Sequence, residues 1–387
     1  MKVTKIIIAP DSFKGSLSSG EVADVIGDEV GAVFPGCEIV SMPIADGGEG
    51  SVDVILSAVG GDVFTEEVLS PDDRLIEAYY GVTGNGTAII EMAQSSGITR
   101  QNGLHPMTSA TFGFGQLILS ALDKGITNFN LCIGGSASTD GGCGMACALG
   151  VRFYDKRGNS FVPCGETLIN IDRIDCTGMD ERVLKSRFTV MCDVDNPLHG
   201  LTGAAYVYGP QKGADADQVL ILDAGLRHYG DVLEKHFGRN FAVVPGAGGA
   251  GGLGAGCLAF LGAEIRSGID AILELYDFKE HCRDTDLIIT GEGKVDSQSF
   301  QGKVLSGILR ESGNIPVWSF CGVCEFDPVG LREMSVTASR SVPVVVFESC
   351  DDVSVEESMD NPVKYLRIAV GKALLHLNDN DTGKILR

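Results

Sequence analysis

The chain has 387 residues, a formal net charge of −22 at pH 7, 52 glycines and only 13 prolines. A chain this acidic repels phosphate backbones and anionic lipid surfaces, which argues against nucleic-acid and membrane partners. No apolar run approaches the ~18 residues of a membrane span, and the run at residues 6–8 is too short for a signal peptide. We therefore expect a cytoplasmic protein.

The N-terminal part of the chain predicts two strand–loop–helix units. Residues 6–9 form a short apolar run, which is typical of a strand buried on both faces. Ser18 and Glu21 have the spacing of a capping box and predict the start of a helix. A second unit follows, with a strand at 39–44 and a helix at 51–59.

The middle of the chain has a different pattern. Segments at 65–69, 76–82 and 87–92 look like strands joined by turn residues, and they predict an antiparallel meander. Alternating helices and strands then return, and a strand at 241–244 is expected ahead of a glycine-rich run at 246–256.

The C-terminal part again predicts strand–loop–helix units. They comprise strands at 286–290, 317–320 and 342–347 and helices at 304–309 and 363–377. We therefore predict an α/β protein of two domains. Residues 1–62 and 285–387 would form a Rossmann-like parallel-sheet domain made of both termini, and residues 63–284 an inserted mixed α/β domain.

Glycine-rich loops are the first candidates for ligand contact, because ligands of open α/β sheets bind outside the carboxyl ends of the strands. The run at 246–256 opens as G-x-G-x-x-G, and the amides of Gly246, Gly248 and Gly249 would suit a phosphate. Tight helix packing through small residues and a dinucleotide fold are the alternatives.

The loop at 134–142 adds polar side chains to the same kind of glycine-rich backbone. Ser136 and Ser138 offer hydroxyl donors to a ligand, while Asp140 could cap the helix that follows. These two functions are compatible with each other.

Charged loops are the second group of candidates. Lys14 stands near a helix N-terminus, where a cation opposes the helix dipole, so it is expected to meet an anion unless it is an ordinary surface lysine. Three acidic loops after strands contain Asp46 and Glu49, Asp193 and Asp195, and Glu292 and Asp296. Such carboxylates suit Mg²⁺ or a general base, and turn formation is the alternative.

Two motif searches limit the chemistry. No Walker A string occurs, so phosphoryl transfer would need another architecture. The C-x-x-C at 321–324 ends an apolar segment and has no second cysteine pair, so no metal or redox role is expected of it.

The ordered set of these motifs resembles the bacterial glycerate kinase family. The matching strings are APDSFKGSL at 9–17, PIADGGEG at 43–50, GSA and DGG within 135–142, CDVDNPL at 192–198, YGPQKGA at 208–214, the glycine run at 245–256 and ITGEG at 289–293. The resemblance implies ATP-dependent phosphorylation of D-glycerate, at O2, giving 2-phosphoglycerate and ADP. It also implies two α/β domains, with the active site in the cleft between them.

We predict roles for individual residues from the chemistry of these loops. The catalytic residues would be Lys14, Asp193 and Asp296. Substrate or phosphate would contact Asp11, Ser12, Gly15, Ser16, Ser136, Ser138, Gly246, Gly248, Gly249, Lys212 and Lys294. Mg²⁺ would be held by Asp193 with Asp195, or by Asp46 with Glu49.

Two other functions stay open at this point. The G-x-G-x-x-G string would suit a nicotinamide-dependent oxidoreductase, and the same scaffold would suit a non-enzymatic sensor of sugar acids or nucleotides. The expected partners are the small molecules glycerate and ATP, and the chain would be a monomer or a homodimer. Where the family string has Thr-Asn, this chain has Ser138-Thr139, which bears on fine specificity.

Overall fold

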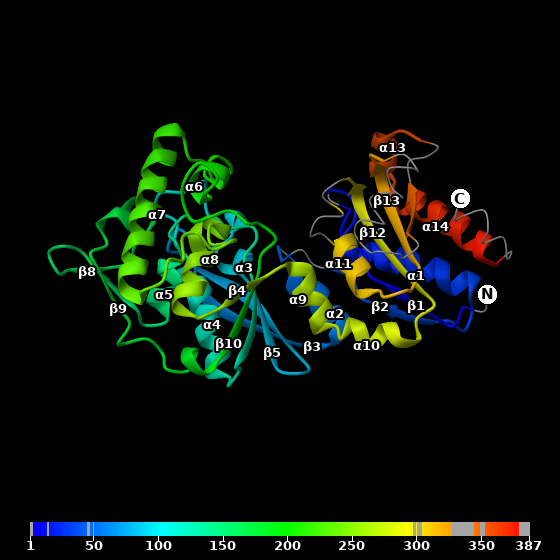
Figure 1. Cartoon of the computed structure of the whole chain (residues 1–387), viewed down its shortest axis with the longest axis horizontal. Coiled ribbons are helices and arrows are strands. Elements are labelled where there is room, and N and C mark those ends of the chain that lie inside the picture. Colours follow the sequence, from blue (N-terminus) through cyan, green and yellow to red (C-terminus); the bar gives the residue numbers. More distant parts are fainter. Residues whose placement is uncertain are drawn as a thin grey trace. The chain divides into compact units, whose positions relative to one another are not determined.

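A computed structural model describes residues 3–13, 15–44, 47–48, 50–296, 299, 304–326, 344–348 and 353–378. It confirms the α/β class, and the chain divides into two compact units (Figure 1). The first unit is Met1–Asp46 with Ile269–Arg387, and the second is Gly47–Gly268. The domain limits at 62 and 285 stay a prediction. No helix in the described part of the chain is long and apolar enough to cross a membrane.

The first unit contains a five-stranded sheet in which every pair of neighbouring strands is parallel. The strand order is β14-β13-β12-β1-β2. The strands are β1 (Lys5–Ile8), β2 (Glu38–Ser41), β12 (Leu287–Val295), β13 (Val317–Cys324) and β14 (Val344–Glu348). The three isoleucines of β1 are fully buried, as a central strand covered on both faces requires.

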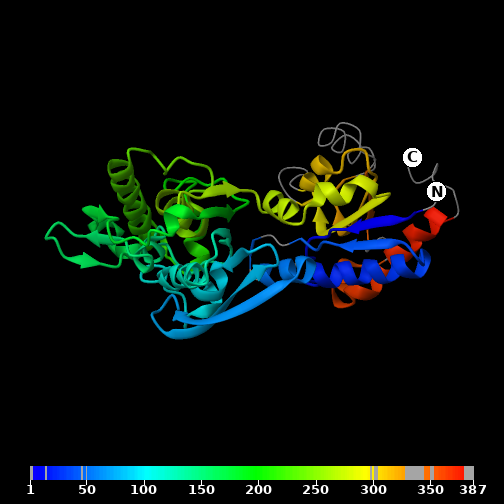
Figure 2. The same cartoon turned by 90° about the horizontal axis from the view of Figure 1, so that it is seen from below.

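Helices cover both faces of this sheet (Figure 2). α1 (Ser19–Val33) and α14 (Pro362–Asn378) pack side by side on one face, and both contribute apolar residues to a core with β1, β12 and β13. Ser18 forms the predicted capping box with Glu21 at the start of α1. Other helices in the described part of this unit are α9 (Gly268–Leu275), α10 (Phe278–His281), η5 (Cys282–Asp284), α11 (Val304–Glu311) and α13 (Val355–Asp360).

The second unit is built on a six-stranded mixed sheet of order β11-β10-β6-β5-β4-β3. Its strands are β3 (Gly61–Leu69), β4 (Leu75–Thr83), β5 (Thr87–Glu91), β6 (Asn128–Cys132), β10 (Arg187–Met191) and β11 (Glu264–Arg266). β3, β4 and β5 form the predicted antiparallel meander, and β5, β6, β10 and β11 continue in parallel. A small antiparallel sheet comprises β7 (Arg152–Tyr154), β8 (Ser160–Phe161) and β9 (Arg173–Asp175).

The helices of the second unit connect and cover these strands. They are α2 (Ser51–Val59), α3 (Met92–Ser96), η1 (Ile98–Arg100), α4 (Phe112–Asp123), α5 (Cys143–Ala148), η2 (Gly165–Asn170), η3 (Val183–Lys185), α6 (Ala204–Tyr208), η4 (Pro210–Lys212), α7 (Ala216–Phe237) and α8 (Gly249–Phe260). The prediction of a strand at 241–244 is wrong, because those residues lie in an irregular segment with turns. Phe241, Ala242 and Val244 pack into an apolar cluster with helical residues, Val243 is 70% exposed, and the segment makes no sheet pairing.

Candidate active site

The first unit has a pocket at the point where its strand order changes direction. β1 lies between β2 and β12. After β1 the chain forms β2 on one side of β1, and the later strands β12 and β13 lie on its other side. Ligands of open α/β sheets bind at such a switch point. A pocket of about 320 Å³ lies there, and five predicted site residues line it: Asp11, Ser12, Ser16, Lys294 and Asp296.

A tight turn after β1 forms one wall of this pocket. The Asp11 carboxylate accepts a hydrogen bond from the amide of Ser12 at 2.7 Å. Gly15 has φ +83°, a left-handed conformation that favours glycine, and its Cα faces the methyl group of Met359 on α13, 3.7 Å from where a Cβ would be. Lys14, between these residues, lies outside the described part of the chain.

The charges on the described pocket wall are mostly negative. Asp11, Glu292 and Asp296 are carboxylates, and Glu292 is only 6% exposed. Lys294 also lines the pocket, but its Nζ forms an ion pair with Glu325 at 2.6 Å, and this partner raises the pKa of the lysine. The ion pair offsets the one positive charge on the described wall, so the wall carries a net negative charge.

In the second unit, the loop after β6 closes around a buried carboxylate. Asp140 is 0% exposed and accepts hydrogen bonds from the amide and hydroxyl of Thr111 at 2.8 and 2.7 Å. It also accepts from the amides of Gly142 and Gly144, both at 3.1 Å, which begin α5. Burial raises the pKa of Asp140, and the four hydrogen bonds act in the opposite direction. This geometry fits the helix-capping alternative.

Lys212 lies in the interior beside the same loop. Its side chain is 1% exposed, and Nζ donates to the carbonyl of Ser138 at 2.5 Å. Burial lowers the pKa of Lys212 to about 7, while the nearby Asp140 charge acts in the opposite direction. The Ser138 hydroxyl is buried without a hydrogen-bond partner, and Ser136, half-buried, pairs through its backbone with Gly97. The sequence placed these residues in one site, and the structure brings Lys212 and Ser138 into contact.

The glycine run packs closely against this loop. A Cβ on Gly251 would lie 2.1 Å from the carbonyl oxygen of Ser138, so only glycine fits there. The amide of Gly249 donates to the carbonyl of Gly246 at 3.0 Å, and the amide of Gly248 also donates within the chain, at 2.9 Å. These amides are therefore already paired with carbonyls, which favours the packing alternative for the run.

The candidate metal ligands are more open. Asp193 and Asp195 are exposed residues after β10, and Asp193 accepts a hydrogen bond from the amide of Gly268 at 2.7 Å. Asp46 and Glu49 lie outside the described residues. Within the residues that the structure describes, no three acidic, histidine or cysteine side chains converge as a metal site. The two carboxylates Asp193 and Asp195 fit Mg²⁺, which proteins often hold with one or two carboxylates together with substrate phosphates.

Two polar residues of the second unit were missed by the sequence reasoning. Glu91, 0% exposed at the end of β5, accepts hydrogen bonds from the amides of Gly50 and Val52 at 3.1 and 2.5 Å. It thereby caps α2, and burial raises its pKa. Its position directly after an apolar strand was a usable signal. Thr111, which binds Asp140, gave no such signal because it lies in a loop before a helix.

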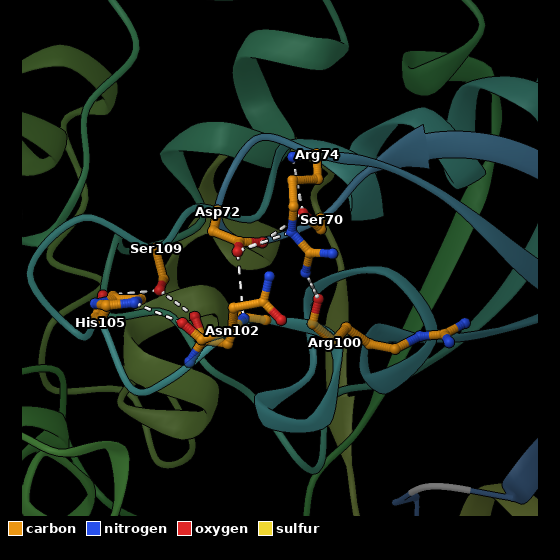
Figure 3. Close-up of polar contacts among 8 residues, drawn as sticks. Ser70, Asp72, Arg74, Arg100, Asn102, His105 and Ser109 are labelled. Atoms are coloured by element: carbon orange, nitrogen blue, oxygen red, sulfur yellow. Dashed lines mark hydrogen bonds and ion pairs between the residues drawn. The ribbon is translucent and has the colours of Figure 1, made fainter.

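A polar network holds the loop that leads into α4 (Figure 3). The Asp72 carboxylate accepts a hydrogen bond from Arg74 at 2.9 Å, which holds the pKa of Asp72 well below its usual range. Arg74 also donates to the carbonyl of Arg100 at 2.9 Å, and the Ser109 hydroxyl donates to the carbonyl of His105 at 2.7 Å. The β3–β4 turn thus fixes the loop that carries the Asp140 partner.

The parallel sheet with a pocket at its switch point defines an α/β protein that binds a small molecule, and the comparisons with known proteins narrow this class. The model of the Glycerate kinase family matches residues 6–374. The glycerate kinase of Bacillus subtilis (strain 168) is 42% identical over 343 residues, which cover 87% of this chain and 90% of that protein. The glycerate 2-kinase of Escherichia coli (strain K12) is 44% identical over 343 residues, with the same coverage.

A crystal structure of a protein described as glycerate kinase 2 from Salmonella typhimurium LT2 has the same fold. The two chains superimpose with a TM-score of 0.83 at 35% identity, and 98% of this chain and 99% of that chain are covered. This chain therefore belongs to the glycerate kinase family. It is a kinase, a phosphotransferase with an alcohol group as acceptor, which confirms the predicted enzyme class and does not favour the oxidoreductase.

Proposed function

We propose that this enzyme transfers the γ-phosphoryl group of Mg·ATP to the 2-hydroxyl of D-glycerate, giving 2-phosphoglycerate and ADP. The observation that carries the proposal is the family match across residues 6–374, with 44% identity to a protein described as glycerate 2-kinase. The match covers 87% of this chain and 90% of that relative, and this extent supports a shared activity. Mg²⁺, when bound, neutralises charge on the transferred phosphoryl group.

We assign the residues of the first unit to substrate contact and proton transfer. The Ser12 hydroxyl donates to the Asp11 carboxylate at 3.4 Å and the Ser16 hydroxyl to the Phe13 carbonyl at 3.0 Å, and both would turn to an anionic oxygen when substrate binds. Lys14 would add positive charge beside Lys294, which is paired with Glu325. Asp296, half-buried in the pocket wall, would accept the proton of the glycerate hydroxyl. Asp193 and Asp195 are exposed carboxylates suited to Mg²⁺, as are Asp46 and Glu49 from the chemistry of their side chains.

Lys212 receives a different role from the one that its charge first indicates. Its ammonium group is buried and bound to a backbone carbonyl, so we propose that it positions the loop of Ser136 and Ser138. The glycine run 246–256 would support the same loop through close packing. Both features act on the shape of the loop, which precise substrate placement requires.

³¹P NMR of the product formed from ATP and D-glycerate tests the proposal directly. A resonance that coincides with added 2-phosphoglycerate, formed only with both substrates and Mg²⁺, is the expected result. A 3-phosphoglycerate resonance would refute the assignment of O2 alone. Absence of any glycerate-dependent ADP formation would refute the reaction and favour a binding function.

A further inference from the structure

We propose that Glu91 is a positioning residue of this kinase, which fixes the loop at residues 47–50 in the shape that the binding of Mg·ATP requires. The inference rests on the proposed function in taking Mg·ATP as the phosphoryl donor. Three sets of contacts support it: those of the Glu91 carboxylate, those of the 47–50 loop, and those of the helix α2 that follows. Glu91 is 0% exposed, so it acts through the loop and touches no substrate itself.

The Glu91 carboxylate fastens the end of β5 to a segment 41 residues earlier in the chain. One oxygen accepts a hydrogen bond from the amide of Gly50 at 3.1 Å, and the other accepts one from the amide of Val52 at 2.5 Å. A carboxylate in the interior is costly unless hydrogen bonds satisfy it. Both oxygens are thus committed to the start of α2.

The 47–50 loop needs support from outside itself. Gly47 and Gly50 have φ +76° and +88°, and glycine loses more backbone freedom on ordering than any other residue. Gly50 is the N-cap of α2, and it has no side chain that could bind the first helical amides. Glu91 takes the place of that cap, and it ties the loop to the strand end.

The body of α2 is anchored independently of Glu91. Val52 and Ile55 are 0% exposed, and α2 packs so closely on β4 that a Cβ on Gly81 would lie 2.8 Å from Leu56. A lost cap would therefore loosen the first turn and the loop before it, while the rest of the helix stays packed on the sheet. Glu91 thus supports the loop more than the fold.

The same loop lies against the ends of two further strands. The carbonyl of Gly47 accepts a hydrogen bond from the amide of Gly134, just after β6, at 3.1 Å, and a Cβ on Gly47 would lie 3.4 Å from Met191, the last residue of β10. Ser136 is two residues beyond Gly134, and Asp193 is two residues beyond Met191. The loop that Glu91 holds is therefore a neighbour of both segments that the proposed function gives to substrate and Mg²⁺.

Calorimetric titration of the full chain with Mg·ATP tests this role in the variant Glu91→Gln. Glutamine keeps the size of the side chain, but it offers one acceptor oxygen to two amides and turns an NH₂ donor toward one of them. We expect the Kd for Mg·ATP to rise at least fivefold, since removing a partner that orients a metal site costs ~10–100-fold in affinity or activity. A smaller folded fraction alone would lower the amount of binding and leave the Kd unchanged.

Hydrogen–deuterium exchange of the nucleotide-free protein follows the loop directly. The peptide that covers residues 47–59 should exchange faster in Glu91→Gln than in the wild type, because the amides of Gly50 and Val52 lose their acceptor. Unchanged exchange in this peptide would refute the idea that Glu91 fixes the loop.

Asp286→Asn is the matched control. Asp286 also accepts hydrogen bonds from two backbone amides that are distant in the sequence, those of Thr4 and Lys5, at 2.6 and 3.2 Å. It lies at the amino ends of β1 and β12, whereas ligand loops follow the carboxyl ends of parallel strands. The Kd for Mg·ATP should change less than twofold in this variant, and a change equal to that of Glu91→Gln would overturn the proposal.

Ser51→Ala loosens the same loop without disturbing a buried carboxylate. The Ser51 hydroxyl, on a residue that is 1% exposed, donates to the carbonyl of Gly48 at 2.7 Å. Its loss should raise the Kd for Mg·ATP at least twofold. An unchanged Kd in folded Glu91→Gln, or in Ser51→Ala where Glu91→Gln does not fold, would overturn the positioning role.

The same measurements separate this inference from the proposed function. If D-glycerate is phosphorylated but Glu91→Gln binds Mg·ATP as the wild type does, the positioning role fails and the proposed reaction stands. If Glu91→Gln weakens the binding of Mg·ATP as expected but no glycerate-dependent ADP appears in the wild type, the proposed reaction fails and the role of Glu91 stands.

Discussion

Replacing Lys212 with methionine should stabilise the protein at neutral pH and impair catalysis. The lysine is 1% exposed, and its pKa falls from 10.5 to about 7, which corresponds to about 5 kcal/mol at 1.36 kcal/mol per pKa unit. This is the cost of burying the charge, and it is fully present below pH 7. Methionine removes the cost and also removes the hydrogen bond to Ser138, worth about 1.5–3 kcal/mol. We therefore expect a net gain of about 2–3 kcal/mol at pH 6.

The pH dependence gives the sharper readout. The folded protein binds the Lys212 proton more weakly than the unfolded chain, so unfolding takes up a proton between pH 7 and 10.5. The free energy of unfolding of the wild type should therefore rise by about 2 kcal/mol from pH 7 to 9 relative to Lys212→Met. Lys212→Met should also lower kcat at least tenfold, because the 134–142 loop loses its support.

Urea unfolding followed by far-UV circular dichroism at pH 6, 7, 8 and 9 measures these differences. Lys185→Met is the control, because Lys185 is 67% exposed and should show no such pH-dependent difference from the wild type. Parallel pH profiles for the wild type and Lys212→Met would refute the buried charge. A normal kcat in a more stable Lys212→Met protein would refute the positioning role and leave the electrostatic argument intact.

Three further substitutions test the loops around the site. Asp140→Asn should cost at least ~2–4 kcal/mol in urea unfolding, because one amide oxygen cannot serve four donors, whereas Asp155→Asn on the surface should cost less than ~1 kcal/mol. Gly251→Ala should lower the free energy of unfolding by at least ~2 kcal/mol more than Gly262→Ala. Both glycines have positive φ, but only at Gly251 would an added Cβ lie 2.1 Å from a backbone atom. Equal losses of stability in the two variants would contradict this packing. Lys14→Ala should lower kcat/KM at least tenfold, about 1.4 kcal/mol, in coupled ADP assays; wild-type kinetics would remove Lys14 from the site.

The periodic parts of the fold were accessible from the sequence. The buried strand β1, the capping box at Ser18 and the β3–β5 meander all appear in the pattern of apolar and polar residues. The irregular segment at 241–244 was misassigned because four apolar residues in a row fit a strand and a packed loop equally well. Only the contacts made by the neighbouring glycines, such as Gly251, distinguish close packing from an open phosphate loop.

The acidic residues at strand ends show why site residues were harder to assign than the fold. In the sequence, Glu91, Asp140 and Glu292 all lie at or near the end of an apolar strand or in the loop after it. The hydrogen bonds in the structure show what two of them do. Glu91 accepts hydrogen bonds from two backbone amides at the start of α2, and Asp140 accepts them from three amides and a hydroxyl. Burial raises the pKa of both carboxyls, but oxygens held by several fixed backbone donors in the interior are not accessible to a substrate hydroxyl. Asp140, held by four donors in the interior, is therefore unsuited to proton transfer with a substrate, and the assignment of the general base to Asp296 in the pocket wall stays a proposal.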